Sequence, residues 1–215
     1  MELKAIIFDL DGVICFTDEY HYRAWKALAD SIGVPFDRET NNRLRGVSRM
    51  ASLEILLERC TEDFSQAEKE ELANQKNELY KFMLTQIDGK DLTGEVRSTL
   101  HTLRELGFRL AIGSSSKNTP IILQRLGLEG FFDAVSDGNN ITHSKPDPEV
   151  FQKAAQMLNL PAQSCLVVED ALSGVEAGHR AGMQVACVGD AAAARAGEFN
   201  MRTLGELIPI VQSWK

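Results

Sequence analysis

The chain has 215 residues, of which 44% are hydrophobic and 25% charged, which is typical of a soluble globular protein with one large domain or a core and a smaller insert. The formal net charge of −8 argues against bulk binding to nucleic acid, and no apolar run approaches the roughly 20 residues of a membrane span. The four cysteines lie far apart without C-x-x-C spacing, and the N-terminus enters an apolar strand rather than a signal peptide. These features predict a cytoplasmic protein with reduced thiols and without a nucleic-acid or membrane partner.

The first predicted element is a buried strand at 5–8, a short apolar run of the sequence Ala-Ile-Ile-Phe. The run ends in Asp-Leu-Asp-Gly, which places the carboxylates of Asp9 and Asp11 at the C-terminal end of the strand. In open parallel sheets, ligands bind at this edge. Gly12 allows a sharp bend directly after the two acids. The segment therefore predicts a site for a hard cation, a nucleophile or a general acid/base, and a simple acidic turn is the alternative.

The stretch 18–90 contains no convincing strand. Helical periodicity and a capping box at Ser65-Gln-Ala-Glu68 predict three helices there, at 18–31, 48–60 and 65–85. An all-helical stretch after the first strand of a parallel sheet indicates a domain inserted into a loop. We expect a helical cap domain at 17–91, joined through short linkers to a core made of 1–16 and 92–215.

From residue 94 onward, apolar strands alternate with helical patterns that are punctuated by proline and glycine. Thr203 has capping-box spacing to Glu206 and opens a predicted last helix. This alternation predicts an α/β fold, with a Rossmann-like doubly wound parallel sheet in the core and the all-helical cap inserted into it. The predicted strands are 108–113, 165–168 and 184–188, and the predicted helices are 95–106, 120–126, 148–158 and 173–181.

Three more segments fall where a parallel sheet would bring them beside the first two acids. Small hydroxyl side chains and free backbone N–H groups at 114–118 suit an anion such as phosphate. Lys145 precedes Pro146, which holds it extended, so that it can neutralise nearby acids. Glu169-Asp170 is a second acidic pair at a strand end, and with Asp9 it suits Mg²⁺. A polar loop without a ligand and a solvated lysine are the alternatives for the first two segments.

In this order, the motifs resemble those of the haloacid dehalogenase superfamily of phosphotransferases over essentially the whole chain. The resemblance implies that Asp9 is a nucleophile that becomes an aspartyl-phosphate, and that Asp11 is the general acid/base. It further implies that Ser114 and Lys145 hold phosphate oxygens, and that Mg²⁺ is bound by Asp9, the backbone carbonyl of Asp11, Glu169 and Asp170.

Parts of the predicted cap, and the loop at Lys117-Asn118, resemble the mutases of that superfamily. These enzymes interconvert β-glucose 1-phosphate and glucose 6-phosphate through a bisphosphate, so the implied partner is a small hexose phosphate. We expect the protein to be a monomer. Arg49, next to a helix N-terminus, is the expected clamp for the second phosphate. The substrate-binding residues implied are Asp11, His21, Trp25, Gly46, Val47, Ser48, Arg49, Ser52, Lys76, Ser115, Ser116, Lys117 and Asn118.

Alternative interpretations of the cap residues stay open at this point. Arg49 and Lys76 can be solvated, Trp25 can pack in the cap core rather than stack on a sugar, and His21 can be a packing residue. A sugar-phosphate phosphatase on the same fold, and a non-catalytic Mg²⁺ or sugar-phosphate binding protein, are the alternative functions.

The sequence departs from the pattern of the superfamily's mutases at three positions. Thr93 stands where relatives usually have proline, Phe16 replaces a polar residue in the first linker, and Arg45 replaces the more common lysine. Arg45 keeps the charge but changes the geometry of its donors.

Overall fold

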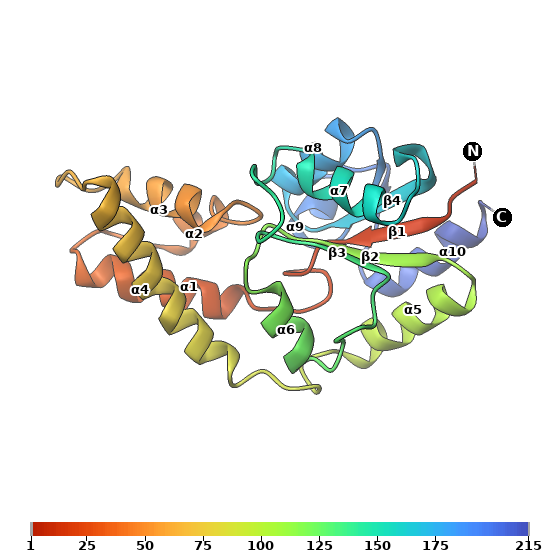
Figure 1. The fold of residues 1–215 in the computed structure, drawn as a ribbon, viewed down its shortest axis with the longest axis horizontal. Helices are drawn as coiled ribbons and strands as arrows, with labels where there is room; N and C mark the ends of the chain where they lie inside the picture. The colour runs from red at the N-terminus through yellow and green to blue at the C-terminus, as the bar shows by residue number, and fades with distance from the viewer. Residues whose placement is uncertain (1, 215) are drawn as a thin grey trace.

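The structure of the protein, a computed structural model, describes residues 2–214 and has a six-stranded sheet with helices on both faces and a helical cap at one end (Figure 1). All neighbouring strands pair in parallel. The strand order β3-β2-β1-β4-β5-β6 is that of doubly wound folds, so the predicted fold class is confirmed. The strands are β1 (Ala5–Phe8), β2 (Arg109–Gly113), β3 (Ala134–Ser136), β4 (Cys165–Glu169), β5 (Gln184–Cys187) and β6 (Phe199–Asn200).

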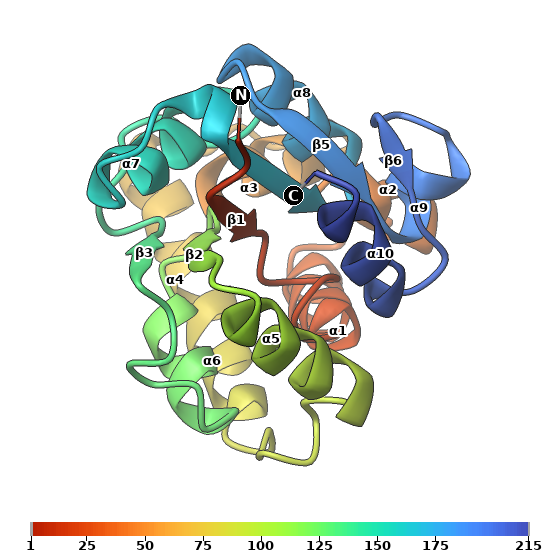
Figure 2. The same ribbon diagram turned by 90° about the vertical axis from the view of Figure 1, so that its right-hand side faces the viewer.

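Helices α7 and α8 cover one face of the sheet, and α5 and α10 cover the other (Figure 2). The central strand β1 is buried on both faces: Ile6 and Phe8 pack in one core with Leu100 of α5, whereas Ile7 packs in the other with Phe151 of α7. This two-sided burial explains why the strand is apolar without alternation. The core helices are α5 (Gly94–Glu105), α6 (Thr119–Arg125), α7 (Glu149–Met157), α8 (Leu172–Arg180), α9 (Gly189–Ala193) and α10 (Leu207–Gln212).

The cap consists of four helices that gather at the carboxyl edge of the sheet (Figure 1). It has its own apolar core, which includes Trp25, Leu53, Leu56 and Ala73. The predicted capping box at Ser65 is present, because its hydroxyl accepts the Glu68 N–H and the Glu68 carboxylate accepts the Ser65 N–H. The cap helices are α1 (Asp18–Ser31), α2 (Arg38–Asn42), α3 (Arg49–Leu57) and α4 (Gln66–Leu84).

The sequence did not predict β3, β6, α2 or α9, which have between two and five residues. Elements of this length show too little periodicity to stand out from loops. At the last helix, Thr203 does not cap as its spacing predicts: a 3-10 turn (Leu204–Glu206) precedes α10, and the Thr203 side chain bonds Glu95 of α5 instead. Within residues 2–214, no helix combines the length and the apolar character needed to cross a membrane.

Candidate active site

The sheet register brings the sequence-predicted acids and the serine loop to one edge. Phe8 pairs with Ile112 on one side and with Val168 on the other. The next residue of β1, Asp9, therefore lies between the ends of β2 and β4, and its N–H donates to the Val168 carbonyl at 2.9 Å. Ser114 follows the end of β2. Residues more than 150 positions apart in the chain thus meet at the edge where parallel sheets bind ligands.

Three carboxylates form a buried cluster at this edge. Ligand oxygens of Asp9, Glu169 and Asp170 all lie within 4.8 Å of one another, and the three side chains are buried. Glu169 also accepts the N–H groups of Asp170 and Ala171 at 2.8 and 2.9 Å, which fixes its orientation. The prediction that two strand-end acid pairs converge is borne out in the geometry, whereas a solvated acidic turn does not fit.

Lys145 lies inside the acid cluster. Its ammonium donates to Asp9 Oδ1 and to Glu169 Oε1, each at 2.5 Å, and its side chain is buried. The two carboxylates raise the pKa of Lys145 against the opposing effect of burial, so the group stays charged. The alternative of a solvated lysine is therefore wrong.

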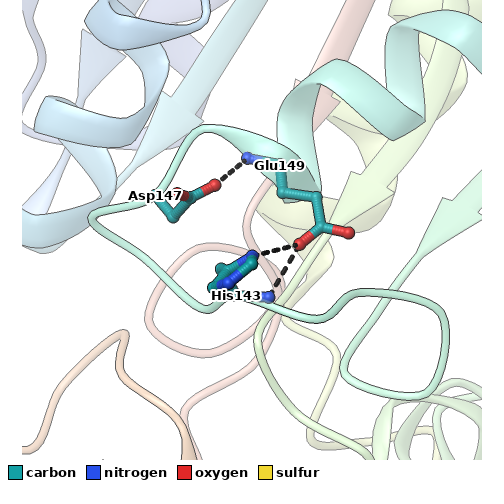
Figure 3. Close-up of side chains that lie close together, drawn as sticks. All are labelled: His143, Asp147 and Glu149. Atoms are coloured by element: carbon teal, nitrogen blue, oxygen red, sulfur yellow. Dashed lines mark hydrogen bonds and ion pairs between the residues drawn. The ribbon is translucent and has the colours of Figure 1, made fainter.

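The loop that carries Lys145 is fixed by a side chain at the start of α7. Glu149 accepts the backbone N–H groups of Thr142 and His143 at 2.9 and 2.7 Å, and its Oε2 lies 3.4 Å from His143 Nδ1 (Figure 3). Asp147 in turn accepts the Glu149 N–H at 2.9 Å. These hydrogen bonds hold both sides of the loop, which lets Lys145 reach inward from it.

Two glycines leave the space that the acids occupy. A Cβ at Gly12 would lie 2.1 Å from the Asp170 carboxylate, and one at Gly174 would lie 1.8 Å from the Glu169 carboxylate. Gly12 also has a φ of +88°, which favours glycine. At Gly174, the start of α8 therefore approaches the Glu169 side chain at the end of β4 closely. The approach at Gly174 serves an acid of the site directly.

Burial dominates the protonation of the acids. It raises the pKa of Asp9, and Lys145 opposes this rise. It raises the pKa of Asp170 to about 7, with Glu169 adding to the rise and Arg45 opposing it. Burial also raises the pKa of Asp11, whose carboxylate accepts a hydrogen bond from the Thr17 hydroxyl that acts in the opposite direction. A carboxyl with a raised pKa is suited to carry a proton near neutral pH.

The serine loop between β2 and α6 lines the cavity, but most of its expected free N–H groups are engaged. The N–H groups of Ser116 and Asn118 donate at 3.1 Å to the hydroxyls of Ser114 and Ser116, respectively, and the Ser114 N–H donates to Ser136. Small polar side chains satisfy nearby backbone groups in this way, which corrects the expectation of free N–H groups at this helix start. The hydroxyls remain at the cavity wall, together with Lys117.

A cavity of about 580 Å³ separates these core residues from the cap. Its lining includes every predicted substrate-binding residue. On the core side these are Asp11, Ser115, Ser116, Lys117 and Asn118; on the cap side they are His21, Trp25, Gly46, Val47, Ser48, Arg49, Ser52 and Lys76.

Lys76 is buried among aromatic rings in the cap wall. Its ammonium lies 3.0 Å from His21 Nδ1, and 4.7 and 4.6 Å from the ring centroids of Trp25 and Tyr80. Burial, and then the charge of Arg49, lower the pKa of Lys76 to about 7. The solvated alternative for Lys76 is wrong. Trp25 packs in the cap core, as its alternative interpretation held, and also borders the cavity.

Arg49 is the first residue of α3, next to the N-cap Ser48, whose hydroxyl accepts the Ala51 N–H at 3.2 Å. Partial burial lowers the pKa of the Arg49 guanidinium. Two cationic side chains, Arg49 and Lys76, thus line one cavity, and the charge of Arg49 disfavours the charged form of Lys76. Such an arrangement is typical of a site that is completed by an anion.

Two residues that sequence reasoning did not assign to the site connect the cap to the core. Asn77 of α4 accepts a hydrogen bond from the Asn118 amide at 2.9 Å, and both side chains are buried. Arg45 donates to Asp170 at 2.9 Å and to Asp190 at 2.6 Å. The departure of Arg45 from the superfamily pattern was a signal that this residue matters. Nothing in the sequence, however, indicates which core residues Arg45 and Asn77 contact.

The acid cluster fits a hard divalent cation. Four acids, Asp9, Asp11, Glu169 and Asp170, face two neighbouring cations, Lys145 and Arg45, so the carboxyl groups outnumber the cations and disfavour one another's ionised form. All the candidate ligand atoms are oxygens, which Mg²⁺ prefers. The close approach at Gly12 brings Asp170 to the Asp-x-Asp-Gly segment, where such an ion would be shared.

A parallel doubly wound sheet with a buried acid after its first strand, a lysine and an acid pair at its carboxyl edge is typical of a class of phosphoryl-transfer enzymes. Residues 3–182 match the haloacid dehalogenase-like hydrolase family. The chain belongs to this family, and the predicted recognition of an enzyme of this superfamily is confirmed.

Similar proteins include mutases and phosphatases. The chain is 41% identical over 189 residues to a β-phosphoglucomutase of Bacillus subtilis, which covers 87% of this chain and 84% of the relative. It is 30% identical over 185 residues to a phosphorylated carbohydrates phosphatase of Thermotoga maritima, covering 85% and 83%. A crystal structure of β-phosphoglucomutase from Clostridium difficile matches with a TM-score of 0.92 at 33% identity, covering 99% of this chain and 96% of that one.

Proposed function

We propose that the chain is a Mg²⁺-dependent β-phosphoglucomutase, which interconverts β-glucose 1-phosphate and glucose 6-phosphate through glucose 1,6-bisphosphate. The observation that carries the proposal is the pair of cations, Arg49 and Lys76, in the cap wall of a cavity whose other wall holds the core acids. A phosphatase for a small monophosphate needs a phosphate site only beside its nucleophile. A mutase also holds the second phosphate of the bisphosphate at a distance from it.

In the first half-reaction, the phosphoryl group resides on Asp9. The 6-hydroxyl oxygen of β-glucose 1-phosphate attacks the phosphorus atom, the bond from phosphorus to the Asp9 oxygen breaks, and Asp11 takes the hydroxyl proton. The bisphosphate then turns round in the cavity. Asp9 attacks the phosphorus at position 1, the bond to the sugar oxygen breaks, and Asp11 returns its proton to that oxygen. This sequence combines covalent and general acid/base catalysis.

The surrounding core residues neutralise and orient the transferring group. The Lys145 ammonium, held between Asp9 and Glu169, lies where it can also donate to a phosphoryl oxygen. The Ser114 hydroxyl is a second donor at this edge. A Mg²⁺ ion held by Asp9, Asp170, Glu169 and the Asp11 carbonyl would supply positive charge to the phosphoryl oxygens. Phosphoryl transfer depends mainly on such positioning and charge.

The cap binds the phosphate group that is not being transferred. Arg49 and Lys76 approach it from the cap, and Lys117 approaches from the serine loop of the core. Closure of the cap also excludes water, which would otherwise hydrolyse the aspartyl-phosphate.

The test compares isomerisation with hydrolysis. With β-glucose 1-phosphate, Mg²⁺ and a trace of glucose 1,6-bisphosphate, we expect formation of glucose 6-phosphate to exceed release of inorganic phosphate by at least about 10²-fold, because closure excludes water. In Arg49→Ala the mutase rate should fall by about 10²-fold, while hydrolysis of p-nitrophenyl phosphate should change by less than a few-fold. Arg43→Ala, at an exposed cap arginine that pairs with Glu58, is the matched control.

The second candidate function is a sugar-phosphate phosphatase, which the 30% identity to the phosphorylated carbohydrates phosphatase favours. Rapid release of phosphate without isomerisation would establish it in place of the mutase. Turnover that Asp9→Asn abolishes would exclude a non-catalytic binding protein. A panel of hexose 1-phosphates of both anomers would then define the preferred sugar.

A further inference from the structure

The guanidinium of Arg45 crosses from the cap to a cluster of carboxylates. Its Nη2 lies 2.9 Å from Asp170 Oδ2, its Nη1 lies 2.6 Å from Asp190 Oδ2, and its Nε lies 3.7 Å from Asp18 Oδ1. The Arg45 side chain is 25% exposed and that of Asp170 only 6%, whereas Asp190 is 71% exposed. One cap side chain thus contacts a buried acid of the core site and an acid at its rim.

The backbone of Arg45 is also tied to the core. The Ser173 hydroxyl donates to the Arg45 carbonyl at 3.1 Å, and a Cβ at the next residue, Gly46, would lie 2.5 Å from that hydroxyl. The loop can therefore lie directly against the start of α8. The position of the guanidinium follows from this docked loop rather than from a freely rotating side chain.

Asp170 has two competing partners. Its carboxylate belongs to the cluster of acids whose oxygens lie within 4.8 Å of one another, and it is also the acceptor of Arg45 Nη2. A divalent cation bound by that carboxylate would lie close to the guanidinium, and two positive groups at such a distance repel each other. Arg45 Nη1 keeps a separate acceptor, Asp190, which is not part of the acid cluster.

We propose that Arg45 is the counter-ion of Asp170 in the metal-free protein, and that binding of a divalent cation transfers the guanidinium from Asp170 to Asp190. Asp190 thereby keeps the cap attached while Asp170 binds the metal. The proposal rests on the metal site of the proposed function, but not on the mutase reaction. By linkage, a cap held to Asp170 weakens metal binding, and bound metal weakens that contact by the same factor.

The test is calorimetric titration with Mg²⁺ alone at pH 8, which needs no substrate and no turnover. Arg45→Ala removes the competing charge and should lower the dissociation constant for Mg²⁺ by about tenfold. Arg45→Lys should give an intermediate value, because an ammonium lacks the fork that spans two carboxylates. Arg43→Ala should bind Mg²⁺ as the wild type does.

A double-mutant cycle tests the role of Asp190. Asp190→Asn removes the alternative acceptor, so the guanidinium remains on Asp170 and Mg²⁺ binding should weaken by about threefold. In the Arg45→Ala background, Asp190→Asn should change the dissociation constant for Mg²⁺ by less than twofold. Unchanged or weaker binding in Arg45→Ala, or an Asp190→Asn effect that is equal in both backgrounds, would overturn the proposal. These results are independent of whether the mutase assay succeeds, and absence of Mg²⁺ binding in every protein would refute both the metal site and this proposal.

Discussion

Asp9 and Asp11 are two residues apart, but their environments suit different tasks. Asp9 pairs with the Lys145 ammonium, whereas Asp11 accepts the Thr17 hydroxyl at the entrance to the cap. Burial raises the pKa of both carboxyls. The ammonium favours the ionised form that a nucleophile needs. A neutral hydroxyl partner leaves Asp11 able to exchange a proton.

We predict that Asp11→Asn lowers kcat by 10²- to 10⁴-fold, the range typical of losing a general acid/base. The amide keeps the backbone carbonyl and the shape of the side chain. Affinities for Mg²⁺ and inorganic phosphate should therefore stay within about threefold of the wild type. Steady-state kinetics and calorimetry measure the two effects. Asp30→Asn, at an exposed acid of cap helix α1, is the control, and unchanged turnover in Asp11→Asn would refute the role.

Lys76 leads to a prediction about pH. Because burial and Arg49 lower the pKa of Lys76 to about 7, the side chain is charged below that pH and increasingly neutral above it. Inhibition by sulfate, a dianion throughout this range, should therefore weaken between pH 6 and pH 9 at saturating Mg²⁺. Bound anion favours the ammonium, so the midpoint should lie above 7. Lys76→Gln should flatten the profile, and an equally steep profile in that variant would contradict the assignment.

Residue types at the ends of strands were predictable, whereas contacts between segments were not. The motif at Asp9 and the pair at Glu169 follow apolar runs, and the parallel sheet requires that they meet. The contacts from Arg45 to Asp190 and from Asn77 to Asn118 join residues 145 and 41 positions apart. No local pattern encodes such pairs, because they depend on how the cap lies on the core.

At the scale of elements, the loop before α7 shows how one side chain positions another. Glu149 accepts two N–H groups from the far side of the loop, and Asp147 accepts the N–H of Glu149 itself (Figure 3). Lys145 lies between these anchor points and reaches the acids. The loop therefore supplies a fixed ammonium to the acid cluster.

We predict that Glu149→Ala lowers kcat by about tenfold, because a loosened loop misplaces the Lys145 ammonium. Glu149→Gln retains a carbonyl acceptor and should recover most of the activity. Faster hydrogen exchange at the Thr142 and His143 amides should accompany the loss in the alanine variant. Glu176→Ala, at an exposed glutamate that pairs with Arg180 on α8, is the control. Slow exchange at both amides in Glu149→Ala would contradict this positioning role.

Long helices and the inner strands were predictable from their periodicity and capping signals. The predicted helix at 65–85 corresponds to α4 at Gln66–Leu84, with its capping box at Ser65. The predicted helix at 48–60 is shorter in the structure, where α3 ends at Leu57. Edge strand β6 has two residues, which are too few for an alternating pattern to be recognised.

At the scale of the molecule, the cap contacts the core on several sides of the cavity. Besides the contacts of Arg45 and Asn77, the Ser48 N–H donates to the Ser144 hydroxyl at 3.2 Å. Tyr80 and Leu84 of α4 also pack in one apolar cluster with Leu10 of the core, so polar and apolar contacts together join the cap to the core. We propose that residues 17–91 move as one unit relative to 1–16 and 92–215. The exposed Phe16 lies at the first crossing between them.

We predict that ligand closes the cap further onto the core in solution. In the Asp9→Asn variant, which cannot form the aspartyl-phosphate, Mg²⁺ with glucose 1,6-bisphosphate should reduce the radius of gyration toward the ~17 Å expected of a compact chain of this length. Small-angle X-ray scattering with and without ligand measures the change. Arg49→Ala in the same background should show a smaller decrease, and equal radii with and without bound ligand would contradict domain closure.

The glycines beside the acids have a consequence for how this chain can vary. Gly12 and Gly174 belong to segments that are 162 positions apart, yet each borders one carboxylate of the acidic pair at the end of β4. Every substitution at either position adds at least a methyl group, and no flexible neighbour can give way without displacing an acid. Two uncharged positions without side chains are thus restricted by the acids beside them, and the charge of the site depends on volume that these two residues leave empty.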